Sequence, residues 1–223
     1  MKALLYKEFK LAMHPICYVF IFLFPFMMLI PSYPLGIGFI YILSCYPVLF
    51  LGANKGQQSN DLLFSTLLPV RKKDIVLARI ITVAIMQLAY MLILTALFPL
   101  ASIIHQSIPG EEIPGLGLDA FVSVLAIAII GYSFADMIFF PIYYKHGKSI
   151  VMSTLLTILG FVVYIGVFTI GLPFIPGLEW YKDTLSGAIW IQFIVLGISL
   201  IIYTLLHFII YKVSSKELEQ VDF

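Results

Sequence analysis

Apolar runs divide the chain into six segments that are long enough, or nearly long enough, to cross a lipid bilayer. Charged residues, prolines and glycines separate these runs. Because a helix needs roughly 20 apolar residues to cross a bilayer core about 30 Å thick, we predict an all-α membrane protein with six transmembrane helices. The predicted spans cover residues 16–30, 36–53, 75–104, 120–142, 150–170 and 188–211. An uncharged segment with two prolines, 31–35, joins the first two spans and indicates a tight hairpin.

Lysine and arginine residues gather on one side of these predicted spans. Of the 13 in the chain, only Lys182 falls on the opposite side. An excess of lysine and arginine marks the cytoplasmic loops of a membrane protein. We therefore predict a multi-pass protein of the cell (plasma) membrane whose two termini, 54–74 loop and 143–149 turn are cytoplasmic.

The N-terminal segment has the pattern of an amphipathic helix. Its apolar positions recur at helical spacing, while Lys7, Lys10 and His14 lie on the opposite face. No small-residue cleavage site follows Ile30, so we interpret 16–30 as an uncleaved first span. The amphipathic helix lies in the membrane interface, where it either anchors that span or also supports a cytoplasmic partner. The apolar positions are Leu5, Phe9, Ala12, Met13 and Ile16.

The loop between the second and third predicted spans contains a short helix of its own. A polar cap at 59–61 begins it and Pro69 ends it after about two turns, roughly 12 Å, which is too short to cross the bilayer. It therefore lies on the cytoplasmic surface, and its leucines either dip into the lipid interface or insert into a groove on a soluble subunit. The residues of this candidate coupling helix and its basic flank are Asp61, Leu63, Phe64, Leu67, Leu68, Pro69, Arg71 and Lys72.

A second cytoplasmic turn follows the fourth predicted span. It is either a structural turn that carries lysines or a second docking contact, through Tyr144, Lys145 and Lys148. Its Gly-Lys-Ser sequence at 147–149 resembles the end of a phosphate-binding loop. The glycine that such a loop requires five residues earlier is Ile142, so this turn is not predicted to bind nucleotide.

Composition excludes several classes of protein. The chain is 61% hydrophobic and 11% charged, whereas soluble domains are roughly 45–50% apolar and 25% charged, so residues 1–223 are predicted to form a single transmembrane domain. A net charge of +1 gives no general attraction to nucleic acid. Two isolated cysteines, four scattered histidines and the lack of an HExxH or GxSxG motif predict no metal, no cofactor and no enzymatic activity.

Two charged residues fall within predicted spans at matching depth. Arg79 lies near the start of the third span and Asp136 near the inner end of the fourth. A charge within the membrane is costly unless it is paired or hydrated. We therefore expect the two to form an intramembrane ion pair, with separate snorkelling of each side chain to the interface as the alternative.

With these features in order, the chain resembles the small six-span permeases of the ABC-2 transporter family. The resemblance covers nearly the whole chain. It rests on the amphipathic N-terminal segment, on the Asp-Leu-Leu-Phe-Ser-Thr-Leu-Leu-Pro-Val-Arg-Lys sequence at 61–72, and on the Pro-Ile-Tyr-Tyr-Lys-His-Gly turn at 141–147. More narrowly, the chain is similar to the compact permeases of Gram-positive bacterial exporters of amphipathic peptides, including phenol-soluble modulin exporters.

The resemblance implies a transport subunit that works with other subunits. Family membership implies separate ABC ATPase subunits on the cytoplasmic side, which would bind the ATP, and a second permease copy or paralogue that completes the pathway. The expected function is export of amphipathic peptides or hydrophobic antimicrobial compounds. A six-span substrate-binding subunit of a small-molecule importer is the main alternative, and a membrane chaperone or sensor is a third.

Overall fold

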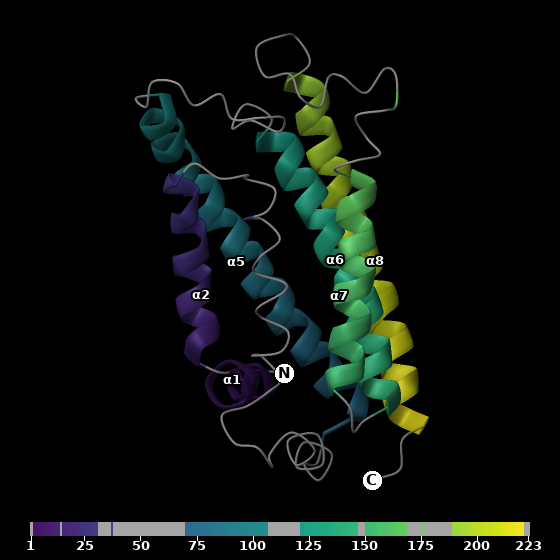
Figure 1. The fold of residues 1–223 in the computed structure, drawn as a ribbon. Helices are drawn as coiled ribbons and strands as arrows, with labels where there is room; N and C mark the ends of the chain where they lie inside the picture. Colours follow the sequence, from purple (N-terminus) through teal and green to yellow (C-terminus); the bar gives the residue numbers. More distant parts are fainter. Residues whose placement is uncertain are drawn as a thin grey trace.

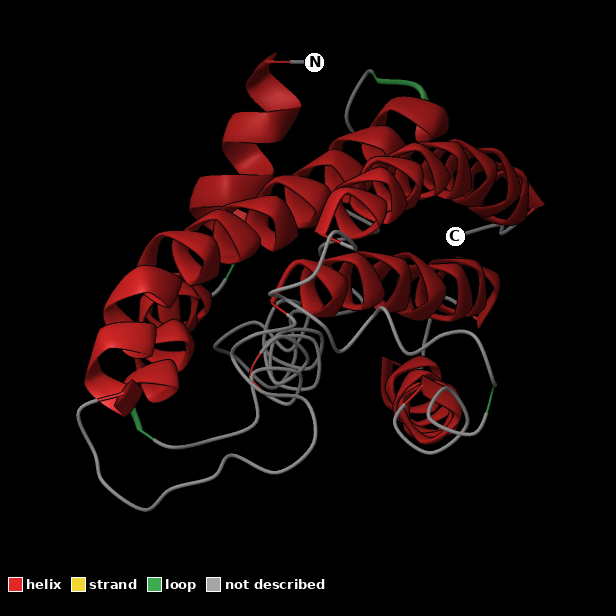
Figure 2. Cartoon of the chain, turned by 90° about the horizontal axis from the view of Figure 1, so that it is seen from above, coloured by secondary structure: helices red, strands yellow, loops and turns green. Residues whose placement is uncertain are grey.

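The structure is a computed structural model that describes residues 2–13, 15–30, 37, 70–106, 121–146, 150–168, 175 and 189–220. These residues form helices, and no strand occurs among them (Figure 2). Four helices make up most of the described part: α5 (Lys72–Gln106), α6 (Phe121–His146), α7 (Ile150–Gly166) and α8 (Ile189–Gln220). The all-α class predicted from the sequence is confirmed for these residues.

The N-terminal part forms a bent pair of helical segments. The first combines α1 (Lys2–Lys7) with the π-helical turn η1 (Glu8–Ala12), and the second combines α2 (Pro15–Phe26) with the 3₁₀ turn η2 (Met27–Leu29). The two are bent by 74°. In Figure 1, α1 therefore lies across the lower end of the bundle while α2 runs along it. This arrangement fits the predicted interfacial helix that precedes a first span.

Helix α6 is the centre of the bundle. It packs against α8 on one side and α7 on another, while α5 runs obliquely from α8 towards α2 (Figure 1). Within the most apolar 18-residue stretch of each helix, 72% of α6 is buried inside the protein, compared with 44% of α5 and 17% of α8. The core around α6 is filled by aromatic side chains that are fully buried: Tyr90, Tyr132, Phe139, Phe140, Tyr144 and Phe161.

Helix lengths support a membrane-spanning protein. Three described helices, within 72–104, 121–145 and 190–220, are long and apolar enough to cross a bilayer, and the bent N-terminal pair makes up to four. Helix α7 is apolar but shorter, with 17 residues. The second predicted span, 36–53, lies outside the described residues except for Ile37, so six spans remain a prediction.

Two helix boundaries follow directly from the sequence. The first span ends at Leu29, and Ile30 is extended, because the residue before a proline disfavours the helical conformation. At the start of α5, Asp74 accepts two hydrogen bonds from Arg71, Nε to Oδ2 at 3.1 Å and Nη2 to Oδ1 at 3.3 Å. An acidic side chain in the first turn also complements the positive end of the helix dipole.

Candidate functional site

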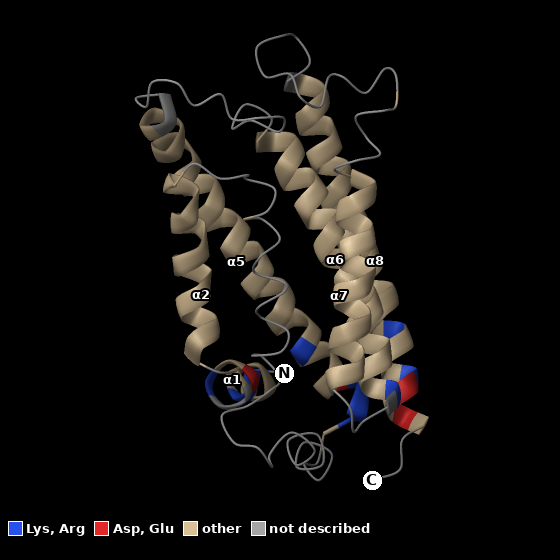
Figure 3. Ribbon diagram, in the orientation of Figure 1, with Lys and Arg blue, Asp and Glu red and all other residues tan. Residues whose placement is uncertain are grey.

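Charged residues gather at one end of the described bundle, as the positive-inside pattern predicts (Figure 3). This end carries α1, the beginning of α5 and the ends of α6 and α8. Exposed pairs there include Lys73 and Glu219, whose Nζ and Oε1 atoms are 3.3 Å apart and connect α5 to α8. The hydrogen bonds to Asp74 raise the pKa of the Arg71 guanidinium above its ordinary value. We call this end of the molecule the charged end.

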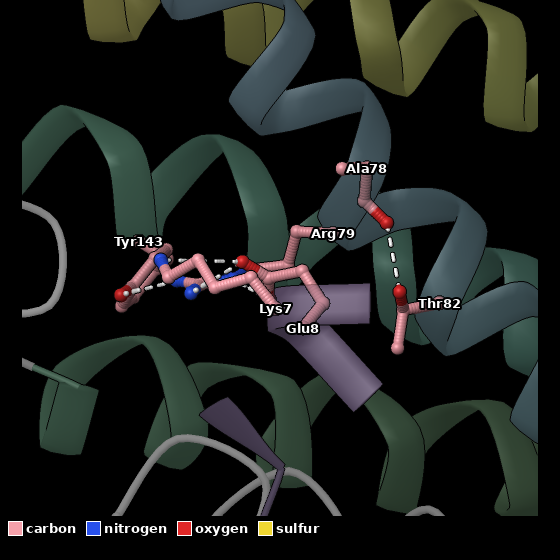
Figure 4. Close-up of polar contacts among 6 residues, drawn as sticks. All are labelled: Lys7, Glu8, Ala78, Arg79, Thr82 and Tyr143. Carbon is pink, nitrogen blue, oxygen red and sulfur yellow. Dashed lines mark hydrogen bonds and ion pairs between the residues drawn. The ribbon is translucent and has the colours of Figure 1, made fainter. Parts of the chain in front are cut away.

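A buried ion pair lies just inside the charged end. Arg79 on α5 and Glu8 at the start of η1 are only 3% and 4% exposed. Their side chains form a bidentate contact, with Arg79 Nε donating to Glu8 Oε2 at 2.9 Å and Arg79 Nη2 donating to Oε1 at 3.2 Å (Figure 4). A fork of this kind suits the planar guanidinium and is stronger than a neutral hydrogen bond.

The same cluster reaches a third helix. Arg79 Nη1 donates to the hydroxyl of Tyr143 on α6 at 3.2 Å, and Lys7 Nζ lies 3.7 Å from Glu8 Oε1. One turn further along α5, the buried Thr82 hydroxyl donates to the Ala78 carbonyl of the same helix, so it takes no part in the cluster (Figure 4). The cluster of Lys7, Glu8, Arg79 and Tyr143 therefore ties the N-terminal helix, α5 and α6 together, and we call it the basal cluster.

Glu8 was not among the residues singled out from the sequence. The amphipathic pattern was built from apolar positions, whereas the buried face of this segment contains Leu4, Glu8 and Met13. Two features of the sequence point to Glu8. Glu8 is the only acidic residue before Asp61, and it follows Leu4 by one helical turn.

The described contacts of Arg79 and Asp136 are with different partners. Arg79 contacts Glu8 and Tyr143, while Asp136 Oδ2 accepts from Gln87 Nε2 at 3.0 Å and lies 3.1 Å from His207 Nε2. The two positions also lie at different levels. Asp136 lies at the level of Gln87, which is eight residues, or about 12 Å of helix, beyond Arg79.

A second polar cluster forms around Asp136, which is fully buried. Tyr203 donates to Gln87 Oε1 at 2.7 Å, and His207 Nδ1 lies 2.8 Å from the Tyr203 carbonyl oxygen. These contacts join α5, α6 and α8. Sequence reasoning missed the partners of Asp136 because Gln87 and His207 are 49 and 71 residues away from it.

Of the predicted coupling residues, only four lie in the described part of the chain. Asp61, Leu63, Phe64, Leu67, Leu68, Pro69 and Lys148 lie outside it. Arg71 is exposed and Lys72 partly exposed at the start of α5, and Lys145 is exposed near the end of α6. Tyr144 is instead fully buried, because α6 continues to His146 and turns this side chain into the core. The predicted turn contact at Tyr144 is therefore corrected.

No group of three or more potential metal ligands occurs among the described residues. In the described part, Cys17 is buried in the apolar core.

The whole chain was compared with known proteins. The family model described as ABC-2 family transporter protein matches residues 3–219. No curated protein and no solved structure matches the chain.

Proposed function

The chain belongs to the ABC-2 transporter family, as an integral membrane protein, and we propose that it is the permease subunit of an ABC exporter driven by a separate cytoplasmic ATPase. Proteins of this family are membrane components of transporters and are not themselves catalytic. The proposal assigns ATP binding and hydrolysis to the partner, and the charged end of this chain to the contact with it.

The family match over residues 3–219 carries the permease assignment, and the basal cluster supports the proposed coupling to the ATPase. Helix α5 begins directly after the predicted coupling segment, and Arg79 lies two turns inside it. A displacement of α5 at its beginning reaches Glu8 and Tyr143 through hydrogen bonds that are shielded from water. A buried, bidentate contact resists sliding because separating it takes the Glu8 carboxylate away from a buried guanidinium, at a cost of about 3–5 kcal/mol. Motion of the ATPase would therefore move α1, α5 and α6 together.

We assign the contact itself to the predicted helix at 61–69. Phe64 and Leu67 would fill an apolar groove on the ATPase, and burial of such side chains stabilises a contact by roughly 1.5–3 kcal/mol each. Arg71, Lys72 and Lys145 would lie at the rim, where charges mainly set orientation.

The proposed pathway lies between two permease chains. The described helices pack around α6 through fully buried aromatic side chains. We therefore place the pathway along the surfaces at which two chains would meet. The second chain is a copy or a paralogue. The cargo we propose, amphipathic peptides or hydrophobic antimicrobial compounds, rests on the resemblance to peptide exporters and on the largely apolar spans.

The test is a double substitution, Phe64→Asp with Leu67→Asp, in a tagged chain purified from membranes of its own host. We expect the variant to insert normally but to lose co-purification of a Walker-motif ATPase and to lose transport. The matched control is Leu116→Asp with Leu118→Asp, in the loop predicted to be external, which should keep both. Insertion, ATPase recovery and transport at wild-type levels in the Phe64 and Leu67 variant would contradict the coupling assignment.

A further inference from the structure

The cluster around Asp136 contains an acid and an imidazole in direct contact within the helical bundle. Asp136 is fully buried, and the His207 side chain is 11% exposed. Asp136 lies ten residues, or about 15 Å, from the end of α6 and so well inside the candidate span of 121–145. Ionisable side chains at such depth are costly to keep and commonly mark functional sites.

The hydrogen-bond partners fix where one hydrogen of His207 must lie. Its Nδ1 atom is 2.8 Å from the backbone carbonyl oxygen of Tyr203, which can only accept. Nδ1 must therefore carry a hydrogen in this geometry. The variable proton of the ring is the one at Nε2, which faces Asp136 Oδ2 at 3.1 Å.

One proton is therefore shared between His207 Nε2 and Asp136 Oδ2. With it, the pair is either carboxylate and imidazolium or carboxylic acid and imidazole, and both forms have zero net charge. Without it, two lone pairs face each other and a net negative charge is left at a buried position. With a second proton, the acid and the imidazolium together leave a net positive charge at the same buried position. Both changes weaken the contact between α6 and α8.

We propose that Asp136 and His207 form a proton-binding site inside the membrane-spanning bundle, which holds α8 against α6 and α5 most firmly while the pair keeps one shared proton. Gln87 completes the site from α5, because its amide donates to the same Oδ2 atom and accepts from Tyr203. Gaining or losing a proton would thereby shift the position of α8, independently of the role proposed for the basal cluster.

The other charged groups on the surrounding helices lie at different levels. Arg79 precedes Gln87 by eight residues and is bound to Glu8 and Tyr143. On α8, Lys212 lies five residues beyond His207, with Nζ 4.5 Å from the centre of the Phe208 ring.

Among the described residues of the neighbouring helices, the remaining titratable groups to consider are phenols. Helix α7, which packs against α6, contributes Tyr164, whose hydroxyl donates to the Ile127 carbonyl. Tyr203 directly adjoins the pair, and its ring centre is 4.0 Å from that of His207. The tyrosines within about two turns of the site on α5, α6 and α8 are Tyr90, Tyr132, Tyr143, Tyr203 and Tyr211.

The first experiment measures the thermal midpoint of the full chain in lipid nanodiscs as a function of pH. Wild-type protein should show a maximum, with a fall towards both acid and alkaline pH. Asp136→Asn removes the carboxylate, so loss of the shared proton can no longer leave a buried negative charge and the alkaline fall should disappear. Tyr203→Phe removes a hydrogen bond but no proton of the pair, so it should lower the thermal midpoint at every pH and leave the shape of its pH dependence unchanged. His146→Gln should also leave the shape of the pH dependence unchanged.

An unchanged alkaline fall in Asp136→Asn would overturn the proposal. A second measurement on protein with native Asp136 decides the question if that variant does not fold. In a His14→Gln, His105→Gln, His146→Gln variant, His207 is the single imidazole, and nitrogen NMR of labelled histidine reports each ring atom. Nδ1 should stay protonated throughout while Nε2 alone titrates. Titration at Nδ1, or at neither nitrogen, would also overturn the proposal.

Discussion

A single buried charge can determine where three helices meet. Arg79 is only 3% exposed, so the position of its guanidinium is tied to the groups that satisfy it. Glu8 supplies two acceptors and the Tyr143 hydroxyl supplies a third. Lysine could not replace this residue, because an ammonium group cannot make the same fork.

At this scale we predict that Glu8→Gln is strongly destabilising. It removes the carboxylate that the buried Arg79 guanidinium contacts through two hydrogen bonds, so the free energy of unfolding should fall by about 3–5 kcal/mol. Denaturant unfolding in detergent measures the change.

The matched control for that substitution is Glu219→Gln. Glu219 forms an exposed pair with Lys73, and such pairs contribute about 0–1 kcal/mol. Equal losses for the two variants would show that the buried ion pair has no special role.

The charged residues themselves could be predicted from the sequence, but their partners could not. Helical spacing identified Arg79 and Asp136 as intramembrane charges, and both are buried. Their actual partners depend on how the helices cross, since Glu8 and Arg79 are separated by 71 residues. Depth counted along a helix gives a level within the membrane, and it says nothing of the direction in which a side chain points.

At the scale of helices, α7 approaches α6 closely at a residue without a side chain. A Cβ atom at Gly160 would lie 2.5 Å from Ile138 Cδ1 and 3.6 Å from Phe134 Cε1 on α6. Gly197 on α8 has nothing within 4 Å of the same position. The two glycines therefore differ sharply in how close another helix comes.

We predict that Gly160→Leu destabilises the bundle by about 1–3 kcal/mol, because the added side chain forces α7 away from α6. Gly197→Leu serves as the control, and it should leave the unfolding midpoint nearly unchanged since its side chain enters open space. Unfolding midpoints in the same detergent compare the two. A loss at Gly197 as large as that at Gly160 would argue against close packing as the cause.

Helix boundaries were more predictable than packing. Pro31 ends the first span where the sequence indicates, and the start of α5 falls within three residues of the predicted third span. The fourth helix is longer than predicted, since Pro141 lies inside α6 rather than at its end. Proline is tolerated within membrane helices when neighbouring groups satisfy the freed carbonyl, which composition alone does not reveal.

For the whole molecule, the distribution of charge is one-sided. The described lysines and arginines lie at the charged end, in agreement with the pattern along the sequence (Figure 3). Because positively charged loops tend to stay in the cytoplasm, this asymmetry supports the predicted orientation, which stays a prediction.

We predict that a membrane-impermeant maleimide labels Leu116→Cys in intact cells and does not label Lys145→Cys, in a background of Cys17→Ala and Cys45→Ala. Both positions should react after the membrane is permeabilised, which confirms that each cysteine is accessible. Labelling of Lys145→Cys in intact cells would reverse the proposed orientation.

The long separation between Glu8 and Arg79 has a consequence for biosynthesis. Glu8 leaves the ribosome early, whereas Arg79 follows 71 residues later and Tyr143 a further 64 residues after that. Until α5 has been inserted, the N-terminal helix must rest on the lipid surface with its carboxylate in water. The basal cluster thus closes only late in synthesis, so a truncated nascent chain would expose Glu8 and give quality-control proteases a way to recognise an unfinished molecule.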